Sequence, residues 1–216
     1  MNMKNCLTAC LCGMLAAAML PACTGRSKTG GYRDVDAWER ATRNARKAYS
    51  HEAFVASENY RYSRDMWRGA ALNQHAPAHS YVVILLAEQR GRLYINDRIA
   101  MDFPVCSGRV GGHETPTGTF HITEKRAEYR SHSYGSFVDA NDNIVKGGIA
   151  SWEAAPAGSH FKGASMPYWM RFNGAIGMHV GNVHRESDSH GCVRIPEEAC
   201  KILFSKLGVG SRVIVK

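Results

Sequence analysis

Two apolar runs joined by turn-forming residues limit the fold of this chain more than any other feature of its sequence. Residues 78–108 read AHSYVVILLAEQRGRLYINDRIAMDFPVCSG. The runs are rich in Val, Ile and Tyr, which favour strands, while EQRG and ND are typical of hairpin turns. We therefore expect a β-rich domain that begins at about residue 77 and occupies residues 77–216.

Strand and turn signals continue beyond these runs. Pro116 and Gly118 occupy turn positions ahead of an alternating segment, and the final residues, SRVIVK, are expected to close the sheet as its last strand. Further short strands or loops are expected in three segments: 119–122, 143–152 and 168–181. In the last of these, Tyr168, Trp169 and Phe172 are expected to belong to the core or to the wall of a groove. The predicted fold class is mainly β.

One short helix is expected near the C-terminus. Pro196 opens the segment PEEACKILFSKLG, in which Glu197 and Glu198 occupy the first turn and Gly208 forms a stop. The helix is therefore expected to begin just after Cys192.

A helical arm is expected to precede the β-rich domain. Residues 36–72 contain no Pro and no Gly before Gly69, and the spacing of their apolar residues predicts one or two amphipathic helices. The arm is either a spacer or packing appendage, or a basic arm that binds the cell wall. We favour the spacer, because runs of charge usually mark a solvated face. Residues 24–34 are rich in Gly, Ser and Lys and are expected to form a flexible tether, so that 23–76 comprises tether and arm.

The N-terminus has the pattern of an export signal. Lys4 precedes an apolar run over residues 6–20, which is too short to span a bilayer but has the length of a secretory signal core. In LPAC, Ala22 directly precedes Cys23, a pattern that resembles the lipobox of bacterial lipoproteins. We expect residues 1–22 to be removed and Cys23 to carry the lipid. The protein would then be exported and anchored to a membrane on the periplasmic side of the envelope. The alternatives are an ordinary signal peptide with a chance cysteine, or an uncut membrane anchor.

The charge of the chain restricts its partners. The formal net charge is +8 and the pI about 9.2, which favour an anionic polymer or surface. The sequence has neither a zinc-finger spacing nor an aromatic RNA-binding motif, and its basic residues are scattered among acidic ones. We therefore expect no nucleic-acid partner.

The cysteines fall into two groups. Four of the seven lie within the first 23 residues, which leaves only Cys106, Cys192 and Cys200 for the folded part. An odd number argues against a disulfide scaffold and leaves at least one thiol free or intermolecular.

The motif DSHGCVRIP, residues 188–196, predicts a reactive thiol at Cys192. A thiolate is favoured by a neighbouring imidazole and by the N-terminus of a helix, and both are expected here. The amides of Gly191 and Cys192 are placed to face a developing oxyanion. His190 would share the face of Cys192 on an extended strand, whereas His179 would approach from a separate strand. The spacing alone leaves both histidines open as the base.

These residues carry a resemblance to a known family. SHGCVR resembles the signature of the L,D-transpeptidases of the YkuD domain family, in which a His and a gap precede Ser/Thr-His-Gly-Cys, an apolar residue and Arg or Asn. FPVCSG, GGHETPTGTFHI, MPYWMRF, GMHVG and SRVIVK are similar to other segments of the family, so the resemblance covers most of residues 79–216. It implies a β-sandwich-like catalytic domain that remodels peptidoglycan and needs no cofactor.

The resemblance also implies the roles of individual residues. Cys192 matches the nucleophile and His179 the general base, whose imidazole would be oriented by the backbone carbonyl of Val180. His190 would shape the oxyanion side together with Gly191.

Two further positions match the signature and are expected to contact substrate. These are Ser189 and Arg194, of which the arginine would hold a substrate carboxylate through two hydrogen bonds. Only nine residues, 180–188, separate His179 from Ser189, fewer than in many members of the family. The shorter loop is expected to alter which substrates are selected more than it alters the reaction of the thiol.

The expected function is peptidoglycan L,D-transpeptidation, with a thioester between Cys192 and a stem tetrapeptide that is then transferred to an amine. The alternatives are a carboxypeptidase or amidase on the same domain and a non-catalytic wall-binding lipoprotein. A zinc site made by His179, His184, His190 and Cys192 is disfavoured, because their spacing follows no common zinc pattern. No oligomeric state is predicted.

Overall fold

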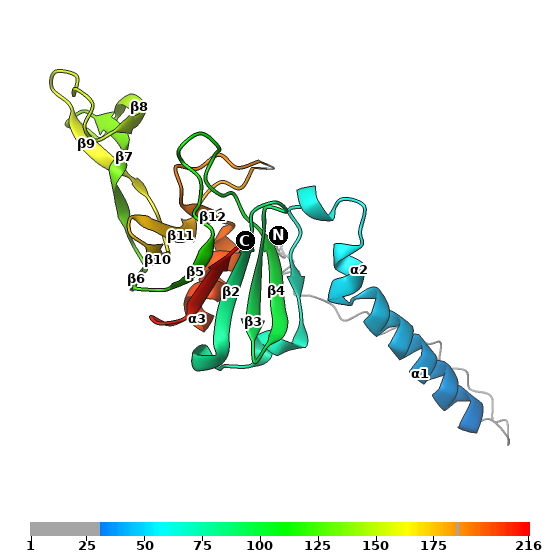
Figure 1. Ribbon diagram of the computed structural model, residues 1–216. Helices are drawn as coiled ribbons and strands as arrows, with labels where there is room; N and C mark the ends of the chain where they lie inside the picture. Colours follow the sequence, from blue (N-terminus) through cyan, green and yellow to red (C-terminus); the bar gives the residue numbers. More distant parts are fainter. Residues whose placement is uncertain (1–30, 185) are drawn as a thin grey trace, which may run out of the picture. The chain divides into compact units, whose positions relative to one another are not determined.

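A computed structural model describes residues 31–184 and 186–216 of the chain (Figure 1). Contacts divide the chain into two compact units at Ala45 and Arg46. Helix α1 (Gly31–Ala48) includes residues on both sides of this division. Its last turn carries Arg46 and Lys47, whose positive charges interact favourably with the negative end of the helix dipole. The helix begins inside the segment expected to be a tether. Within the described residues, no helix combines the length and apolar character needed to cross a membrane. The predicted signal peptide and Cys23 lie outside these residues.

The second unit is mainly β, and its largest sheet has six strands. In spatial order these are β1 (Trp67–Arg68), β4 (Arg98–Pro104), β3 (Arg90–Ile95), β2 (Ser80–Leu85), β13 (Arg212–Val215) and β5 (Gly118–His121). Strands β2, β3 and β4 form the antiparallel meander that the apolar runs predicted. Asn96 and Asp97 at its second turn both have positive φ, of 49° and 58°, as this type of tight turn requires. The last strand of the chain, β13, lies parallel to β2 and antiparallel to β5.

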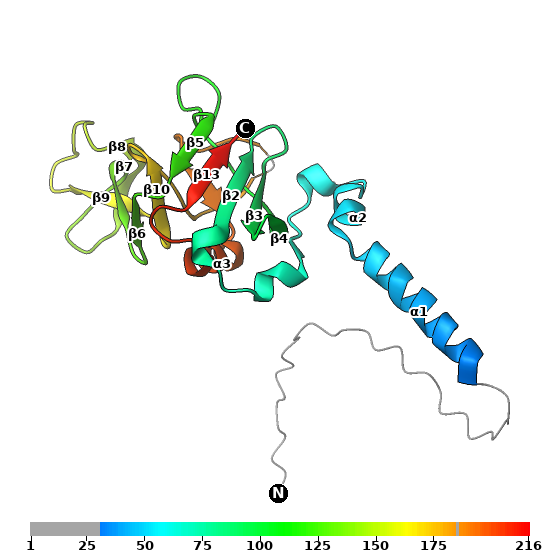
Figure 2. The ribbon, with the colours of Figure 1, turned by 60° about the horizontal axis from the view of Figure 1, so that its bottom comes forward.

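Two smaller sheets complete the second unit (Figure 2). The four-stranded sheet contains β12 (Val193–Ile195), β11 (Ile176–Val180), β10 (Trp169–Asn173) and β6 (Glu124–Arg126). The three-stranded sheet contains β8 (Ile144–Ala150), β7 (Arg130–Val138) and β9 (His160–Ser165). Strands β7, β8 and β9 lie in sequence between β6 and β10. The three-stranded sheet is therefore an insertion between two neighbouring strands of the four-stranded sheet.

The six-stranded and four-stranded sheets share one apolar core. Val82 and Val213 from the large sheet belong to the same buried cluster as Met170 and Met178 from the small one. Helix α3 (Glu197–Lys206) adds Leu203 to this cluster. This arrangement confirms the predicted β-sandwich-like fold with a short helix after the cysteine and a helical segment before it.

Helix α3 begins later than its sequence suggested. Strand β12 intervenes, so the helix starts at Glu197, five residues after Cys192. Val193 and Ile195 are β-branched and fully buried, and their pairing with β11 extends the chain here. The start of the helix is therefore not adjacent to the thiol, and helix-terminal activation of Cys192 is not supported.

The segment 46–76, which the sequence assigned to the arm, packs on the six-stranded sheet: His51 and Tyr60 cover Asp102 on its outer face, whereas Ala71 joins the apolar core. The short helix α2 (His51–Val55) is capped by Ser50, whose side chain accepts the Ala53 amide at 3.1 Å. Tyr60 is buried, and β1 pairs with β4 at the edge of the sheet. This segment is thus part of the second unit and packs on it, as the packing alternative expected.

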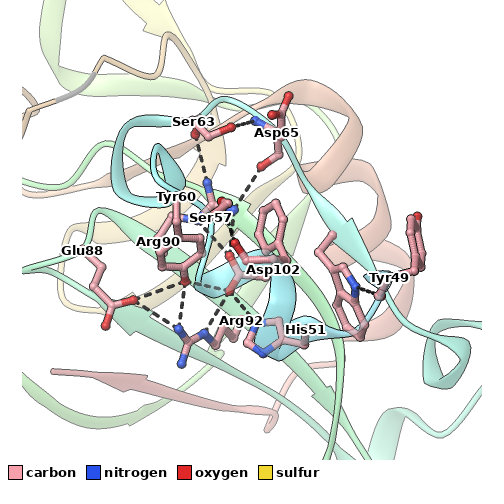
Figure 3. A network of polar contacts seen from close by, with 12 residues as sticks. Tyr49, His51, Ser57, Tyr60, Ser63, Asp65, Glu88, Arg90, Arg92 and Asp102 are labelled. Atoms are coloured by element: carbon pink, nitrogen blue, oxygen red, sulfur yellow. Dashed lines mark hydrogen bonds and ion pairs between the residues drawn. The ribbon is translucent and has the colours of Figure 1, made fainter. Parts of the chain in front are cut away.

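A buried network of charges explains this packing (Figure 3). Asp102 on β4 is fully buried and accepts hydrogen bonds from Arg90 Nε at 2.8 Å and Arg92 Nε at 2.9 Å. The segment supplies two further partners for Asp102, Tyr60 Oη and His51 Nε2, both at 2.8 Å. A buried carboxylate without such partners is strongly unfavourable. The charged residues on the outer face of β3 and β4 therefore require the segment that covers them.

Candidate functional site

A cleft of about 920 Å³ lies over one face of the four-stranded sheet. Its floor follows from strand register. Arg194 pairs with His179 across β12 and β11, and Trp169 pairs with Arg126 across β10 and β6. Because Met170 pairs with Met178, Trp169 lies beside His179, with 6.0 Å between ring centroids.

A second row of residues crosses the same face two positions along each strand. Gly177 pairs with Arg171, which in turn pairs with Glu124. The intervening residues of these strands, Met170 and Met178, point into the core and are fully buried. The alternation of a strand thus places core residues on one face of the sheet and polar residues on the other.

His179 is held as a neutral base. Its side chain is buried, and Nδ1 lies 2.8 Å from the carbonyl oxygen of Val180. Burial, assisted by the positive charge of Arg194, lowers the pKa of His179 to about 4 even though the Val180 carbonyl opposes this shift. A neutral ring that donates from Nδ1 carries its lone pair on Nε2. This is the protonation state of a general base.

The indole ring of Trp169 packs beside the imidazole of His179. The indole ring is buried and stacks on Tyr129, with 4.7 Å between centroids. Gly177 permits the packing, since a Cβ atom there would lie 2.6 Å from the ring of Trp169. The glycine before Met178 in GMHVG is therefore explained by close approach of an aromatic ring.

Cys192 lies in a bend and not on the extended strand that the sequence argument assumed. Gly191 has a φ of +111°, a conformation that favours glycine. The Cys192 Sγ atom lies 3.9 Å from the carbonyl oxygen of Ala175. Burial raises the pKa of the Cys192 thiol, although the Gly177 amide and two arginines oppose this effect. The thiol is therefore protonated at neutral pH.

Ser189 fixes the loop that carries the thiol. It is 1% exposed, accepts the Gly191 amide at 3.1 Å and donates to the carbonyl oxygen of Cys192. The Gly191 carbonyl accepts from Thr115 Oγ1 at 2.8 Å. The sequence analysis expected the Gly191 amide to face an oxyanion, but this amide is engaged within the loop. The Cys192 amide is left as the candidate donor to an oxyanion. The Ser189 hydroxyl is likewise engaged within the loop, where it had been expected to contact substrate.

His190 connects the loop to the three-stranded sheet. Its exposed ring stacks on Tyr134 of β7 with 4.2 Å between centroids and meets His113 edge-on at 4.8 Å. Burial of part of the ring and the nearby charge of Arg109 lower the pKa of His190. Its ring is therefore positioned by aromatic packing.

Arg194 lies on the floor beside His179. Its Nη1 atom is 3.5 Å from Asp188 Oδ2. Gly181 packs under its aliphatic part, since a Cβ atom there would lie 2.9 Å from Arg194 Cγ. Its backbone exchanges two hydrogen bonds with Cys106, at 2.9 and 3.0 Å, which tie β12 to the end of β4.

The structure gathers the residues that the signature predicted and adds others. Cys192, His179, His190, Ser189, Val180 and Arg194 all line the cleft. Arg126, Tyr129, Tyr134, Trp152 and Arg171 also line it, and the sequence did not indicate them. The alternation in WMRF was the available signal, because it separates Trp169 and Arg171 from the core residues Met170 and Phe172. Trp169 therefore lines the cleft, whereas Phe172 belongs to the core.

The remaining predictions concern metals and disulfides. Within the described part of the chain, no three His, Cys, Asp or Glu side chains are grouped closely enough to hold a metal ion. The three cysteines found there, Cys106, Cys192 and Cys200, are all free.

Comparison with known proteins gives one family and several structures. Residues 79–215 match the family model of the YkuD L,D-transpeptidase catalytic domain. No curated protein matches the chain. A solved L,D-transpeptidase from Stackebrandtia nassauensis is 22% identical, with a TM-score of 0.47 over 66% of this chain and 58% of that one. An L,D-transpeptidase from Mycobacterium smegmatis is 14% identical, with a TM-score of 0.48 over 64% of this chain and 58% of that one. The chain thus spans less than two thirds of the length of these structures.

Proposed function

The chain belongs to the YkuD family of L,D-transpeptidase catalytic domains, and from this premise we propose that it is a peptidoglycan L,D-transpeptidase. The observation that carries the proposal is the pairing of a fixed, neutral imidazole with a thiol in one cleft. His179 is oriented by the Val180 carbonyl, and Cys192 lies at the adjoining edge of the same sheet.

The proposed reaction proceeds through a thioester. Cys192 Sγ attacks the carbonyl carbon at the L-centre of the third stem residue, taken to be diaminopimelate, while its proton passes to His179 Nε2. The Cys192 amide stabilises the oxyanion. The C–N bond to the terminal D-alanine then breaks, and His179 returns the proton to the leaving amine.

The second half of the reaction transfers the acyl group. An acceptor amine gives a proton to His179 and attacks the thioester, and the C–S bond breaks as the thiol regains its proton. Each turnover exchanges one amide bond for another and consumes no nucleotide. Water in place of the amine would release a shortened stem peptide, which is carboxypeptidase activity.

We also propose that the protein is exported and that Cys23 anchors it to a membrane through a lipid. The support is the LPAC pattern after a short apolar run, together with a substrate that lies outside the cytoplasm.

Incubation of the purified protein with disaccharide tetrapeptides tests the proposed reaction. We expect cross-linked dimers and free D-alanine, detected by mass spectrometry, and no product from Cys192→Ala. His179→Ala should lower kcat by about a hundredfold or more, the usual scale for loss of a general base, and His190→Ala should lower it less.

The other outcomes distinguish the rival functions. Shortened monomers without dimers would identify a carboxypeptidase, and absence of turnover with retained wall binding would identify a non-catalytic lipoprotein. A larger loss from His190→Ala than from His179→Ala would assign the base to the other histidine.

A further inference from the structure

Arg126 and the thiol lie toward opposite edges of the four-stranded sheet. Arg126 is the last residue of β6, at the outer edge of the four-stranded sheet, while Arg194 lies on β12 at the opposite edge. Three strand spacings separate the two positions, a distance of about 14 Å. Both side chains line the cleft.

The guanidinium of Arg126 is oriented by its neighbours but keeps one edge open. Its Nε donates to Glu124 Oε1 at 2.6 Å, and its Cζ atom lies 5.8 Å from the ring centroid of Tyr129. The side chain is 59% exposed. The two terminal nitrogens, which form the fork that suits a carboxylate, therefore face solvent at the end of the cleft.

Arg171, on the neighbouring strand, is engaged in a different way. Its Nε donates to Glu124 Oε2 and its Nη1 to the Gly174 carbonyl, both at 2.8 Å. Its Nη2 donates to Tyr129 Oη at 3.3 Å. All three guanidinium nitrogens of Arg171 thus donate hydrogen bonds to other groups of the protein. Arg171 therefore orients its neighbours, whereas the terminal nitrogens of Arg126 are available to a ligand.

The charge at this end of the cleft is not balanced. Glu124 provides one negative charge for two guanidinium groups. Arg126, Arg171 and Arg194 line the cleft, whereas their two carboxylate partners, Glu124 and Asp188, are not among its lining residues, so three guanidinium groups face two carboxylates. An electropositive cleft of this kind favours an anionic ligand.

We propose that Arg126 binds a second carboxylate of the donor stem peptide, remote from the reacting carbonyl. An extended peptide advances about 3.3 Å per residue, so the span from Arg194 to Arg126 corresponds to about four residues. The cleft then selects donors that carry a free carboxylate at this point over donors that carry a carboxamide. This inference rests on the proposed function, since it takes the stem peptide as the ligand.

Binding to the inactive Cys192→Ala protein tests the inference. The ligands are a soluble stem tetrapeptide with free side-chain and α-carboxylates and the same peptide with those groups, apart from the C-terminus, converted to carboxamides. We expect Arg126→Gln to weaken binding of the carboxylate peptide by about tenfold and of the carboxamide peptide by less than twofold, with Arg126→Lys between them.

Arg130→Gln is the matched control. Arg130 is an exposed arginine at the start of β7 that donates to the Gly163 carbonyl and does not line the cleft, so its loss should leave both affinities unchanged. Thermal unfolding of each variant excludes a change in folding as the cause.

Three results would overturn the inference: equal weakening of both peptides, no weakening of either, or no binding of the carboxylate peptide to the parent protein. Its failure is separable from that of the proposed function. Cross-linked product without dependence on Arg126 would overturn the inference alone. Arg126-dependent binding without any turnover would overturn the proposed function alone.

Discussion

Protonation of two side chains determines how the reaction can begin. Burial lowers the pKa of His179 to about 4 and raises the pKa of Cys192, so at neutral pH the free protein holds an uncharged imidazole and an uncharged thiol. The sequence suggested a thiolate stabilised by imidazolium. The structure instead favours proton transfer to His179 during attack.

The pH dependence of thiol alkylation distinguishes these two states. Below its pKa, the thiolate fraction of a thiol falls tenfold for each unit of pH, and the pKa of Cys192 is raised above its ordinary value. We expect the rate of Cys192 alkylation by iodoacetamide to rise steadily from pH 5 to beyond pH 9. A plateau between pH 5 and 8 would instead indicate a thiolate–imidazolium pair. Cys192→Ala corrects for labelling at Cys106 and Cys200.

Local sequence predicted the candidate reacting residues but not their surroundings. The order Ser-His-Gly-Cys is contiguous, so its members were predicted from the signature. The partners of the Gly191 amide depend on how the loop closes, which residue types do not specify. Trp169, Arg171 and Arg126 share one face of the sheet with His179 through the register of β6, β10 and β11, and β6 is distant in sequence from the other two strands.

Among the secondary-structure elements, those with strong alternation were predictable and those without it were not. Strands β2, β3 and β13 carry Val, Ile or Leu on their buried face, and the sequence indicated all three. Strands β7 and β9 are mostly polar and only partly buried, with the sequences RSHSYGSFV and HFKGAS. They therefore lack the regular alternation of apolar residues that predicts a strand. Their pairing depends on the hydrogen bonds of a three-stranded sheet.

The segment 46–76 should behave as part of the catalytic unit. Deletion of residues 1–45 is expected to leave the unfolding temperature nearly unchanged, whereas deletion of residues 1–76 should abolish cooperative unfolding or cause aggregation. The reason is that the longer deletion removes His51 and Tyr60 from the buried Asp102 and exposes the face they cover.

A point substitution tests the same contact without a deletion. Asp102→Asn should lower the free energy of unfolding by about 3 kcal/mol or more, because it leaves two arginines without their buried carboxylate. Glu153→Gln, which removes an exposed ion pair with Lys146, is the control and should cost less than about 1 kcal/mol. Retention of stability in both the longer deletion and Asp102→Asn would restore the spacer interpretation.

For the whole molecule, the proposed lipid anchor at Cys23 leads to a test by fractionation. If Cys23 carries the lipid, Cys23→Ser should move the protein from the membrane fraction to the soluble fraction without changing its turnover of muropeptides. Immunoblots of the two fractions provide the measurement. Persistence in the membrane fraction would contradict lipidation at Cys23.

The position of the last strand affects when this protein can fold. Strand β13, at residues 212–215, lies inside the large sheet between β2 and β5, both of which are made much earlier. Without β13, strand β5 has no partner in the large sheet and one edge of β2 is unpaired, so a chain that is still being synthesised cannot complete this sheet. The large sheet is therefore completed only after residues 212–215 have been made. If the chain is exported as we propose, the sheet stays incomplete until that segment is available to pair with β2 and β5.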